Sequence, residues 1–143
     1  YRKLAEHAVQ KLAPLIGVDR ADWTAGTPLP GGDLADPDAF AVELRRRHPW
    51  LPERLGRRLV AAYGTRVALV LGDAQGLDDL GPCYGADLHE AEVRYLVEQE
   101  WARSAEDILW RRSKLGLLFK DEEVQRLRAR LEKPHAASAV DAA

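Results

Sequence analysis

The sequence contains no methionine in its 143 residues and opens on a tyrosine. A chain of this length would hold about two or three methionines at background usage. We therefore expect a piece of a longer protein or a processed product. Its start carries no apolar run of the length found in secretory signals, and its length is that of one domain.

Cysteine pairs, long apolar runs and an excess of basic charge are also missing. The one cysteine, Cys83, cannot form an internal disulfide, and a single cysteine excludes a cysteine-based zinc site. A lone, unpaired cysteine is typical of a reducing compartment. The longest apolar run, 67–71, is far shorter than the ~20 residues of a membrane-spanning helix. With 21 basic and 23 acidic residues, the net charge of −2 argues against a nucleic acid partner. The reducing compartment indicated by the single cysteine fits a cytoplasmic domain.

Apolar residues recur with helical spacing along most of the chain, which predicts an all-α, mainly helical fold. We expect helices at about 1–13, 36–47, 52–63, 67–71, 88–101, 104–115 and 121–131, with long loops at about 17–36 and 73–87. Residues 134–143 are small and polar and are expected to be disordered. The predicted domain therefore spans 1–133.

Several of these helices have recognisable ends. Asp36 followed by Pro37 is typical of a helix N-terminus, and Gly64 of a C-terminal glycine cap. Ser104 and Asp107 have the spacing of a capping box, with Asp in place of the usual Glu or Gln.

The first helix and the connection after it are punctuated by proline and glycine. Pro14 is expected to end the helix near Ala13, because the residue before a proline disfavours α geometry. The stretch 17–36 is longer than most connections inside compact domains and is the natural internal boundary. Trp23 and Leu29 could attach it to the surface of the domain.

His89 and Glu92 lie three residues apart on one predicted helix face, a spacing that metal sites use. The second half of such a site is missing, because no His-Glu-x-x-His motif or comparable carboxylate partner occurs. The simpler interpretation is that Glu90 and Glu92 complement the dipole at the start of their helix. We therefore predict no metal site.

A cluster of cations beside an indole, formed by Trp110, Arg111, Arg112 and Lys114, could bind a phosphate or an acidic partner. The cluster also lies at the C-terminal end of a predicted helix, where cations are favoured in any case. The run 45–47 has the same explanation.

No catalytic set is apparent from the residues. Neither a dinucleotide fingerprint nor a phosphate-binding loop occurs, and Gly31-Gly32 does not supply one. Ser104 and Ser113 have no visible His partner, and Cys83 has no basic neighbour that would activate its thiol.

Several segments nevertheless occur in a distinctive order. They are 1–8 (YRKLAEHA), 23–24 (WT), 29–32 (LPGG), 63–64 (YG), 90–95 (EAEVRY) and 101–117 (WARSAEDILWRRSKLGL). Together they resemble the C-terminal part of the bacterial, respiratory FAD-dependent glycerol-3-phosphate dehydrogenases, over about residues 1–131. The block 101–117 is the most specific of them.

The resemblance implies a parent enzyme that oxidises sn-glycerol 3-phosphate to dihydroxyacetone phosphate, with FAD as hydride acceptor and quinone as electron acceptor. It implies an FAD and substrate domain preceding this one in the same chain, peripheral association with the inner face of the cytoplasmic membrane, and a homodimer. The family's Gly-Gly-Lys-Leu-Thr-Thr segment, which precedes its Tyr-Arg, is absent here. We expect this helical cap domain to be non-catalytic and to bind no FAD alone.

The resemblance also gives Tyr1 and Arg2 a role in the parent enzyme, where the first helix points its N-terminus toward the flavin. A helix N-terminus carries about +0.5 charge and free N–H groups, which would stabilise negative charge on the flavin ring.

Within this interpretation, the cluster at 110–114 would contact the catalytic domain, a second subunit or anionic lipid. The alternative is a free-standing helical binding module that uses its Arg clusters for nucleic acid or a protein partner. A nucleic acid binder would lose affinity steeply with salt, and the balanced charge counts against it.

Overall fold

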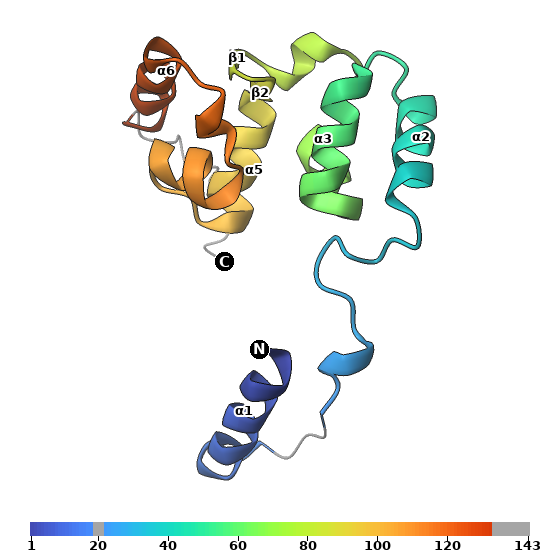
Figure 1. Ribbon diagram of the computed structural model, residues 1–143, viewed down its shortest axis with the longest axis vertical. Coiled ribbons are helices and arrows are strands. Elements are labelled where there is room, and N and C mark those ends of the chain that lie inside the picture. The colour runs from blue at the N-terminus through green and yellow to red at the C-terminus, as the bar shows by residue number, and fades with distance from the viewer. Residues whose placement is uncertain (19–21, 133–143) are drawn as a thin grey trace, which may run out of the picture.

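The computed structural model describes residues 1–18 and 22–132, and most of these are helical (Figure 1). The α-helices are α1 (Arg2–Ile16), α2 (Pro37–Arg47), α3 (Glu53–Tyr63), α4 (Val67–Leu71), α5 (Glu90–Glu100) and α6 (Asp121–Glu132). Short 3-10 turns occur at Thr24–Gly26, Gly64–Arg66, Leu77–Leu80 and Leu115–Leu117, and a π-helical segment at Asp107–Arg112. The predicted all-α, mainly helical fold is confirmed, and the predicted tail 134–143 lies outside the described residues.

The helix ends follow the capping chemistry read from the sequence. The Asp36 carboxylate accepts hydrogen bonds from two backbone N–H groups of α2 at 2.9 and 3.1 Å. Gly64 ends α3 with a φ of 56°. Ser104 and Asp107 exchange two bonds, each 3.1 Å long, from the backbone N–H of one to the side chain of the other. The predicted capping box is therefore present with Asp in the Glu position.

Helix α1 continues past the expected end at Ala13 and stops at Ile16. Pro14 lies in its last turn, where the missing N–H removes a single intrahelical bond. Gly17 then closes the helix in the left-handed conformation, with a φ of 68°.

A small hairpin occupies part of the loop expected at 73–87 and the first positions of the helix expected from Leu88. Strand β1 (Cys83–Gly85) pairs antiparallel with β2 (Leu88–His89), so that α5 begins only at Glu90. The connecting residues Ala86 and Asp87 have φ values of 48° and 60°, as a two-residue hairpin turn requires. The sequence lacks the usual Asn-Gly signal for such a turn, which is why the hairpin was not predicted.

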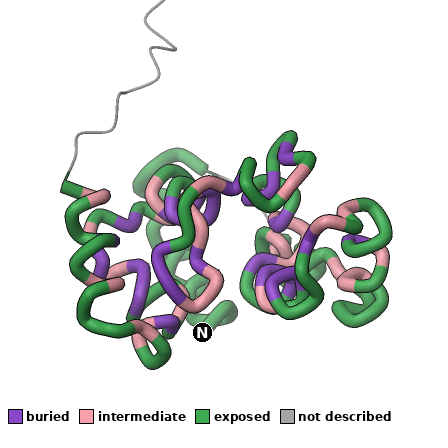
Figure 2. The backbone as a smooth tube through the Cα atoms, turned by 90° about the horizontal axis from the view of Figure 1, so that it is seen from above, coloured by how far each residue is buried: buried purple, intermediate pink, exposed green. Residues whose placement is uncertain are grey.

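The hydrophobic core lies between α3, α4, α5, the π-helical segment and α6. Figure 2 shows the buried segments on the sides where these elements face one another. Its most deeply buried apolar side chains are Leu59, Val67, Leu88, Val93, Leu96, Ile108, Leu109 and Leu127. The α2–α3 pair forms the predicted helical hairpin against one side of this core.

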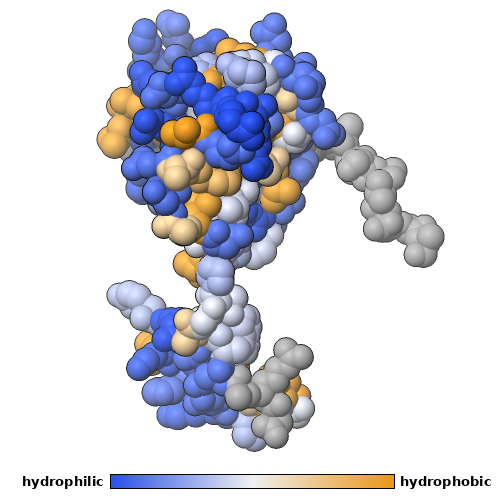
Figure 3. Space-filling view, turned by 90° about the vertical axis from the view of Figure 1, so that its right-hand side faces the viewer, coloured by the Kyte–Doolittle hydropathy of each residue, from blue (hydrophilic) through white to orange (hydrophobic). Residues whose placement is uncertain are grey.

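Helix α1 stands apart from the other helices and buries none of its residues (Figure 1). Figure 3 shows it as a separate lobe joined to the rest by a narrow neck. Trp23 and Leu29 stay 62% and 82% exposed, so the expectation that they attach the connection to the surface was wrong. Across residues 1–18 and 22–132, no helix is long and apolar enough to cross a membrane.

Candidate functional site

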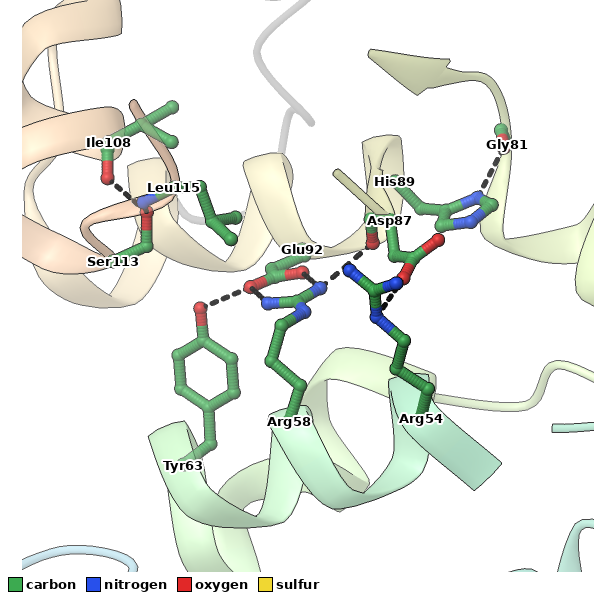
Figure 4. Close-up of polar contacts among 10 residues, drawn as sticks. All are labelled: Arg54, Arg58, Tyr63, Gly81, Asp87, His89, Glu92, Ile108, Ser113 and Leu115. Carbon is green, nitrogen blue, oxygen red and sulfur yellow. Dashed lines mark hydrogen bonds and ion pairs between the residues drawn. The ribbon is translucent and has the colours of Figure 1, made fainter. Parts of the chain in front are cut away.

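A buried carboxylate in the first turn of α5 organises a polar cluster that joins α5, α3 and the hairpin (Figure 4). Glu92 is only 2% exposed. Arg58 of α3 binds both of its oxygens, with Nη1 at 2.8 Å from Oε1 and Nη2 at 2.6 Å from Oε2. The hydroxyl of Tyr63 donates a third bond to Oε1 at 2.7 Å. This two-bonded geometry is the strong form of an arginine–carboxylate pair.

The same arginine also reaches the hairpin turn, because Arg58 Nη2 lies 2.8 Å from the carbonyl oxygen of Asp87. Arg54, one turn earlier in α3, pairs with the Asp87 carboxylate at 3.5 Å. The α3 helix is thus fixed to both α5 and the hairpin through its arginines.

The electrostatics of this cluster make it a structural junction rather than a proton-transfer site. Burial raises the pKa of the Tyr63 hydroxyl, and the negative charge of Glu92 raises it further. For Arg58, burial alone would lower the pKa, but the hydrogen bonds and charge of Glu92 outweigh it and raise the pKa. Both groups therefore keep their protons across the physiological pH range and act as fixed donors.

A second pair joins α6 to the same turn of α5. Arg130 Nη2 lies 2.5 Å from Glu90 Oε1, and the Tyr84 hydroxyl donates to Oε2 at 2.7 Å. Burial pushes the pKa of Glu90 upward, but the bonds from Arg130 and Tyr84 outweigh it and the pKa is lowered. Burial and the bond to Glu90 raise the pKa of Tyr84 to about 12.

The His89 and Glu92 side chains, which are spaced like metal ligands in the sequence, point to different partners. His89 Nδ1 is 3.1 Å from the Gly81 carbonyl oxygen, while Glu92 turns toward α3 (Figure 4). Across the described ranges, no three His, Cys, Asp or Glu side chains are grouped to hold a metal ion. Glu90 and Glu92 do more than complement the helix dipole, because each holds an arginine from another helix.

The three cations of the cluster predicted at 110–114 do not share a common partner. Arg111 pairs with Asp107 at 2.5 Å, Arg112 donates to the Glu100 carbonyl at 3.0 Å, and Lys114 donates to the Trp110 carbonyl. The three cations thus engage three different partners, two of them backbone carbonyls.

The Trp110 side chain stays 45% exposed and covers Gly116 so closely that a Cβ there would collide with the indole. The three cations beside it are exposed as well, with the Arg111 side chain 64% exposed, so the whole cluster presents an open surface.

The start of α1 is open to solvent. Tyr1 provides no side-chain cap, and the first turn contains no acidic residue. The Arg2 guanidinium folds back toward the helix, with Nη1 3.1 Å from Glu6 and 3.3 Å from the Thr24 hydroxyl. The groups available to a ligand at this helix end are therefore the backbone N–H groups of the first turn, and not the Arg2 side chain.

Sequence reasoning missed Arg58 and Arg130, the residues that complete both junctions. Arg58 lies three positions after Leu55 and one before Leu59, both buried. An arginine beside the apolar stripe of a helix is the signal that could have pointed to a buried carboxylate partner. Nothing comparable marks Arg130 among the other arginines of α6.

The described residues define a helical domain in which a buried and a partly buried carboxylate join helices to one another through arginines. The family model for the C-terminal domain of alpha-glycerophosphate oxidase matches residues 23–137. The chain belongs to this family, which confirms the resemblance read from its segments. The match begins after α1, inside the connection identified as the internal boundary.

Among curated relatives, the chain is 44% identical over 128 residues to the aerobic glycerol-3-phosphate dehydrogenase of Escherichia coli (strain K12), covering 89% of this chain and 26% of the relative. It is 47% identical over 125 residues to the D-erythritol 1-phosphate dehydrogenase of Brucella abortus (strain 2308), covering 86% and 25%. A glycerol-3-phosphate dehydrogenase of Pseudomonas aeruginosa is 44% identical over 136 residues, covering 94% and 27%. The chain spans about a quarter of the length of these relatives.

Replacing Arg58 with Met tests the junction at Glu92. The variant leaves a buried carboxylate with Tyr63 as its remaining bonded partner, and we expect the free energy of unfolding at pH 7 to fall by about 3–5 kcal/mol in urea titrations. The matched control is Arg57→Met on the same helix, where exposed pairs with Glu53 and Asp38 are lost and the change should stay below about 1 kcal/mol. Equal losses in the two variants would contradict this role.

The pair of Glu90 and Arg130 predicts a pH dependence of stability. Because the folded pKa of Glu90 lies below the ordinary carboxyl value of 4.5, the unfolded state takes up the proton first as the pH falls. The stabilisation by Arg130 is therefore full above about pH 5 and is lost as the pH falls through the folded pKa. In urea titrations from pH 7 to pH 3, the difference between the wild type and Arg130→Gln should shrink toward zero.

The control for this experiment is Arg128→Gln. Arg128 lies on α6 like Arg130, and the substitution breaks its exposed pair with Glu106. Its effect at pH 7 should be small. A difference between wild type and Arg130→Gln that stays constant over the whole range would rule out the titration of Glu90 as the cause.

Proposed function

We propose that this chain is the C-terminal part of an FAD-dependent dehydrogenase that oxidises sn-glycerol 3-phosphate to dihydroxyacetone phosphate and passes the electrons to quinone. The observation that carries the proposal is the 44% identity to the aerobic glycerol-3-phosphate dehydrogenase over 89% of the chain. A second candidate substrate is D-erythritol 1-phosphate, because the relative named for it is 47% identical. Both candidates are phosphate esters of small polyols.

The reacting groups, in this proposal, belong to an FAD and substrate domain in the same polypeptide. The partly buried carboxylate of Glu90 and the buried one of Glu92 support this assignment, since each is already bound by an arginine and a tyrosine of this chain. The domain itself would be non-catalytic.

Helix α1 would pack against that catalytic domain. Leu4, Leu12 and Leu15 follow a helical spacing and remain more than half exposed, and no residue of α1 is buried. An isolated helix of about 12–15 residues is marginal in water, so a face of this kind calls for a partner. The family model begins at residue 23, which supports assigning α1 to the neighbouring domain.

The start of α1 fits the neighbourhood of a flavin through its backbone. FAD, when bound, would supply the acceptor for the substrate's hydride. The uncapped N–H groups of the first turn, beginning at Tyr1 and Arg2, would face the negative charge that develops. The Arg2 side chain would instead steady the turn through Glu6 and Thr24.

The cluster of Trp110, Arg111, Arg112 and Lys114 would serve as a contact surface for the catalytic domain, a second subunit or the anionic inner face of the membrane. Trp110 with Lys114 offers an exposed indole beside a cation, a combination that suits such contacts. This contact would form only in the assembled enzyme, so it has to be tested there.

Separating the chain from the longer polypeptide tests the proposed function. Titrated with FAD, the 143-residue chain should show no saturable quenching of flavin fluorescence. The longer polypeptide that contains it should purify with FAD and reduce an artificial electron acceptor with sn-glycerol 3-phosphate. Tight FAD binding by the chain alone would overturn the assignment of the reacting groups. A higher kcat/KM with D-erythritol 1-phosphate would favour the second substrate.

Replacing Arg111 and Arg112 with Ala in the longer polypeptide tests the contact surface. We expect a loss of activity, of the oligomer or of membrane association, measured by dye reduction, light scattering and vesicle co-sedimentation. The control is Arg45→Ala with Arg46→Ala, which removes two exposed cations of α2. If all three properties match the wild type, the contact surface lies elsewhere.

A further inference from the structure

Two glycines, 33 positions apart, bring the connection after α1 into backbone contact with the end of α3. The Thr65 backbone N–H donates to the Gly31 carbonyl at 3.1 Å, and the Thr65 hydroxyl donates to the Asp33 carboxylate. A Cβ on Gly64 would collide with the carbonyl oxygen of Gly31, and a Cβ on Gly31 with that of Tyr63. We call this contact of Gly31 with Gly64 and Thr65 the clasp.

A second attachment joins the connection to α1 itself. The Thr24 hydroxyl donates to the Glu6 carboxylate and accepts from Arg2 Nη1 at 3.3 Å. One turn further along the helix, Gln10 Nε2 donates to Asp22 at 2.7 Å. We call the bonds of Thr24 with Glu6 and Arg2 the latch.

The clasp and the latch leave little free chain between them. The 3-10 turn at the latch closes with a bond from Thr27 to Thr24, and the clasp begins at Gly31. Residues 28–30 remain, and two of these three are prolines with a fixed φ. Gly32 also bonds back to the Leu29 carbonyl at 2.7 Å, which makes this short stretch a turn.

The effect on the position of α1 is large. A fully flexible connection from residue 17 to 36 would have a root-mean-square end-to-end distance of about 25 Å. Three free residues have one of about 10 Å. Since α1 buries no residue of its own, these two attachments are what set its place relative to α2–α6 within the described chain.

We propose that Gly31 and Gly64 are positioning residues: their backbone contact, together with the latch at Thr24, fixes where α1 stands relative to the helical domain. The consequence for the reaction rests on the proposed function, because the first turn of α1 is the part that would face the flavin. The positioning itself does not depend on it.

The test measures the distance from α1 to the helical domain by double electron–electron resonance. One spin label is attached to Cys83, the single and exposed cysteine, and a second to Lys11→Cys on the exposed surface of α1. We expect a narrow distance distribution in this background. Gly64→Ala should widen it about twofold or more.

Gly72→Ala is the matched control. Gly72 has almost the same backbone conformation as Gly64, with φ 52° and ψ −133° against φ 56° and ψ −133°. A Cβ on Gly72 meets nothing within 4 Å. The Gly72→Ala variant therefore reproduces the backbone strain of Gly64→Ala without touching the clasp. The width of its distance distribution should equal that of the doubly labelled background.

Thr24→Val gives an independent variant should Gly64→Ala fail to fold, because it breaks the latch far from the core. It should also widen the distribution, while circular dichroism and the melting temperature of the domain stay unchanged. Widths equal to the background in folded Gly64→Ala or in Thr24→Val, or equal broadening in Gly72→Ala, would overturn the positioning role.

A second measurement separates this proposal from the proposed function. In the longer polypeptide, Gly64→Ala should slow flavin reduction by substrate at least threefold at unchanged flavin content, and Gly72→Ala should not. Broader distances with an unchanged rate would leave the positioning intact and remove the link between α1 and the flavin.

Discussion

The buried carboxylate of Glu92 is the constraint on which the helical domain depends. A charge that is almost fully removed from water is tolerated only when it is paired and hydrogen-bonded, and here the partners come from α3. Arg58 lies 34 positions earlier in the chain and Tyr63 lies 29 positions earlier. The two helices can therefore pack closely only in the one register that brings these groups together. Glu90 and Arg130 apply the same constraint between α5 and α6, 40 positions apart.

The molecule has two parts that differ in how much apolar surface they bury. The helices from α2 onward close a core of their own around Leu59, Leu96 and Ile108. Helix α1 has an apolar stripe but none of its residues is buried, and in the described chain it is joined to the rest through the latch, the bond of Gln10 with Asp22, and the clasp. This division agrees with the family match, which starts at residue 23. The described chain thus combines a helical core with one helix that contributes no residue to it.

Much of the fold could be predicted from the sequence because the signals are local. The caps at Asp36, Gly64 and Ser104 are satisfied by groups within four residues, so spacing alone is informative. The hairpin at 83–89 was missed because its turn uses Ala86 and Asp87 in left-handed conformations, without the glycine or asparagine that usually marks it. Of the candidate site residues, His89 and Glu92 share a turn of sequence but turn toward different partners, and the cations near Trp110 separate among three acceptors.

The sequence by itself determined the helical class, the helix caps at Asp36, Gly64 and Ser104, and the family, because these depend on neighbouring residues or on segments in a set order. Only the tertiary structure decided which arginine meets which carboxylate. It also showed that Gly31 and Gly64 are required as glycines, because their backbones touch across 33 positions. Burial and close approach are properties of residues that are distant in the chain, and no local pattern encodes which of several arginines or glycines will meet.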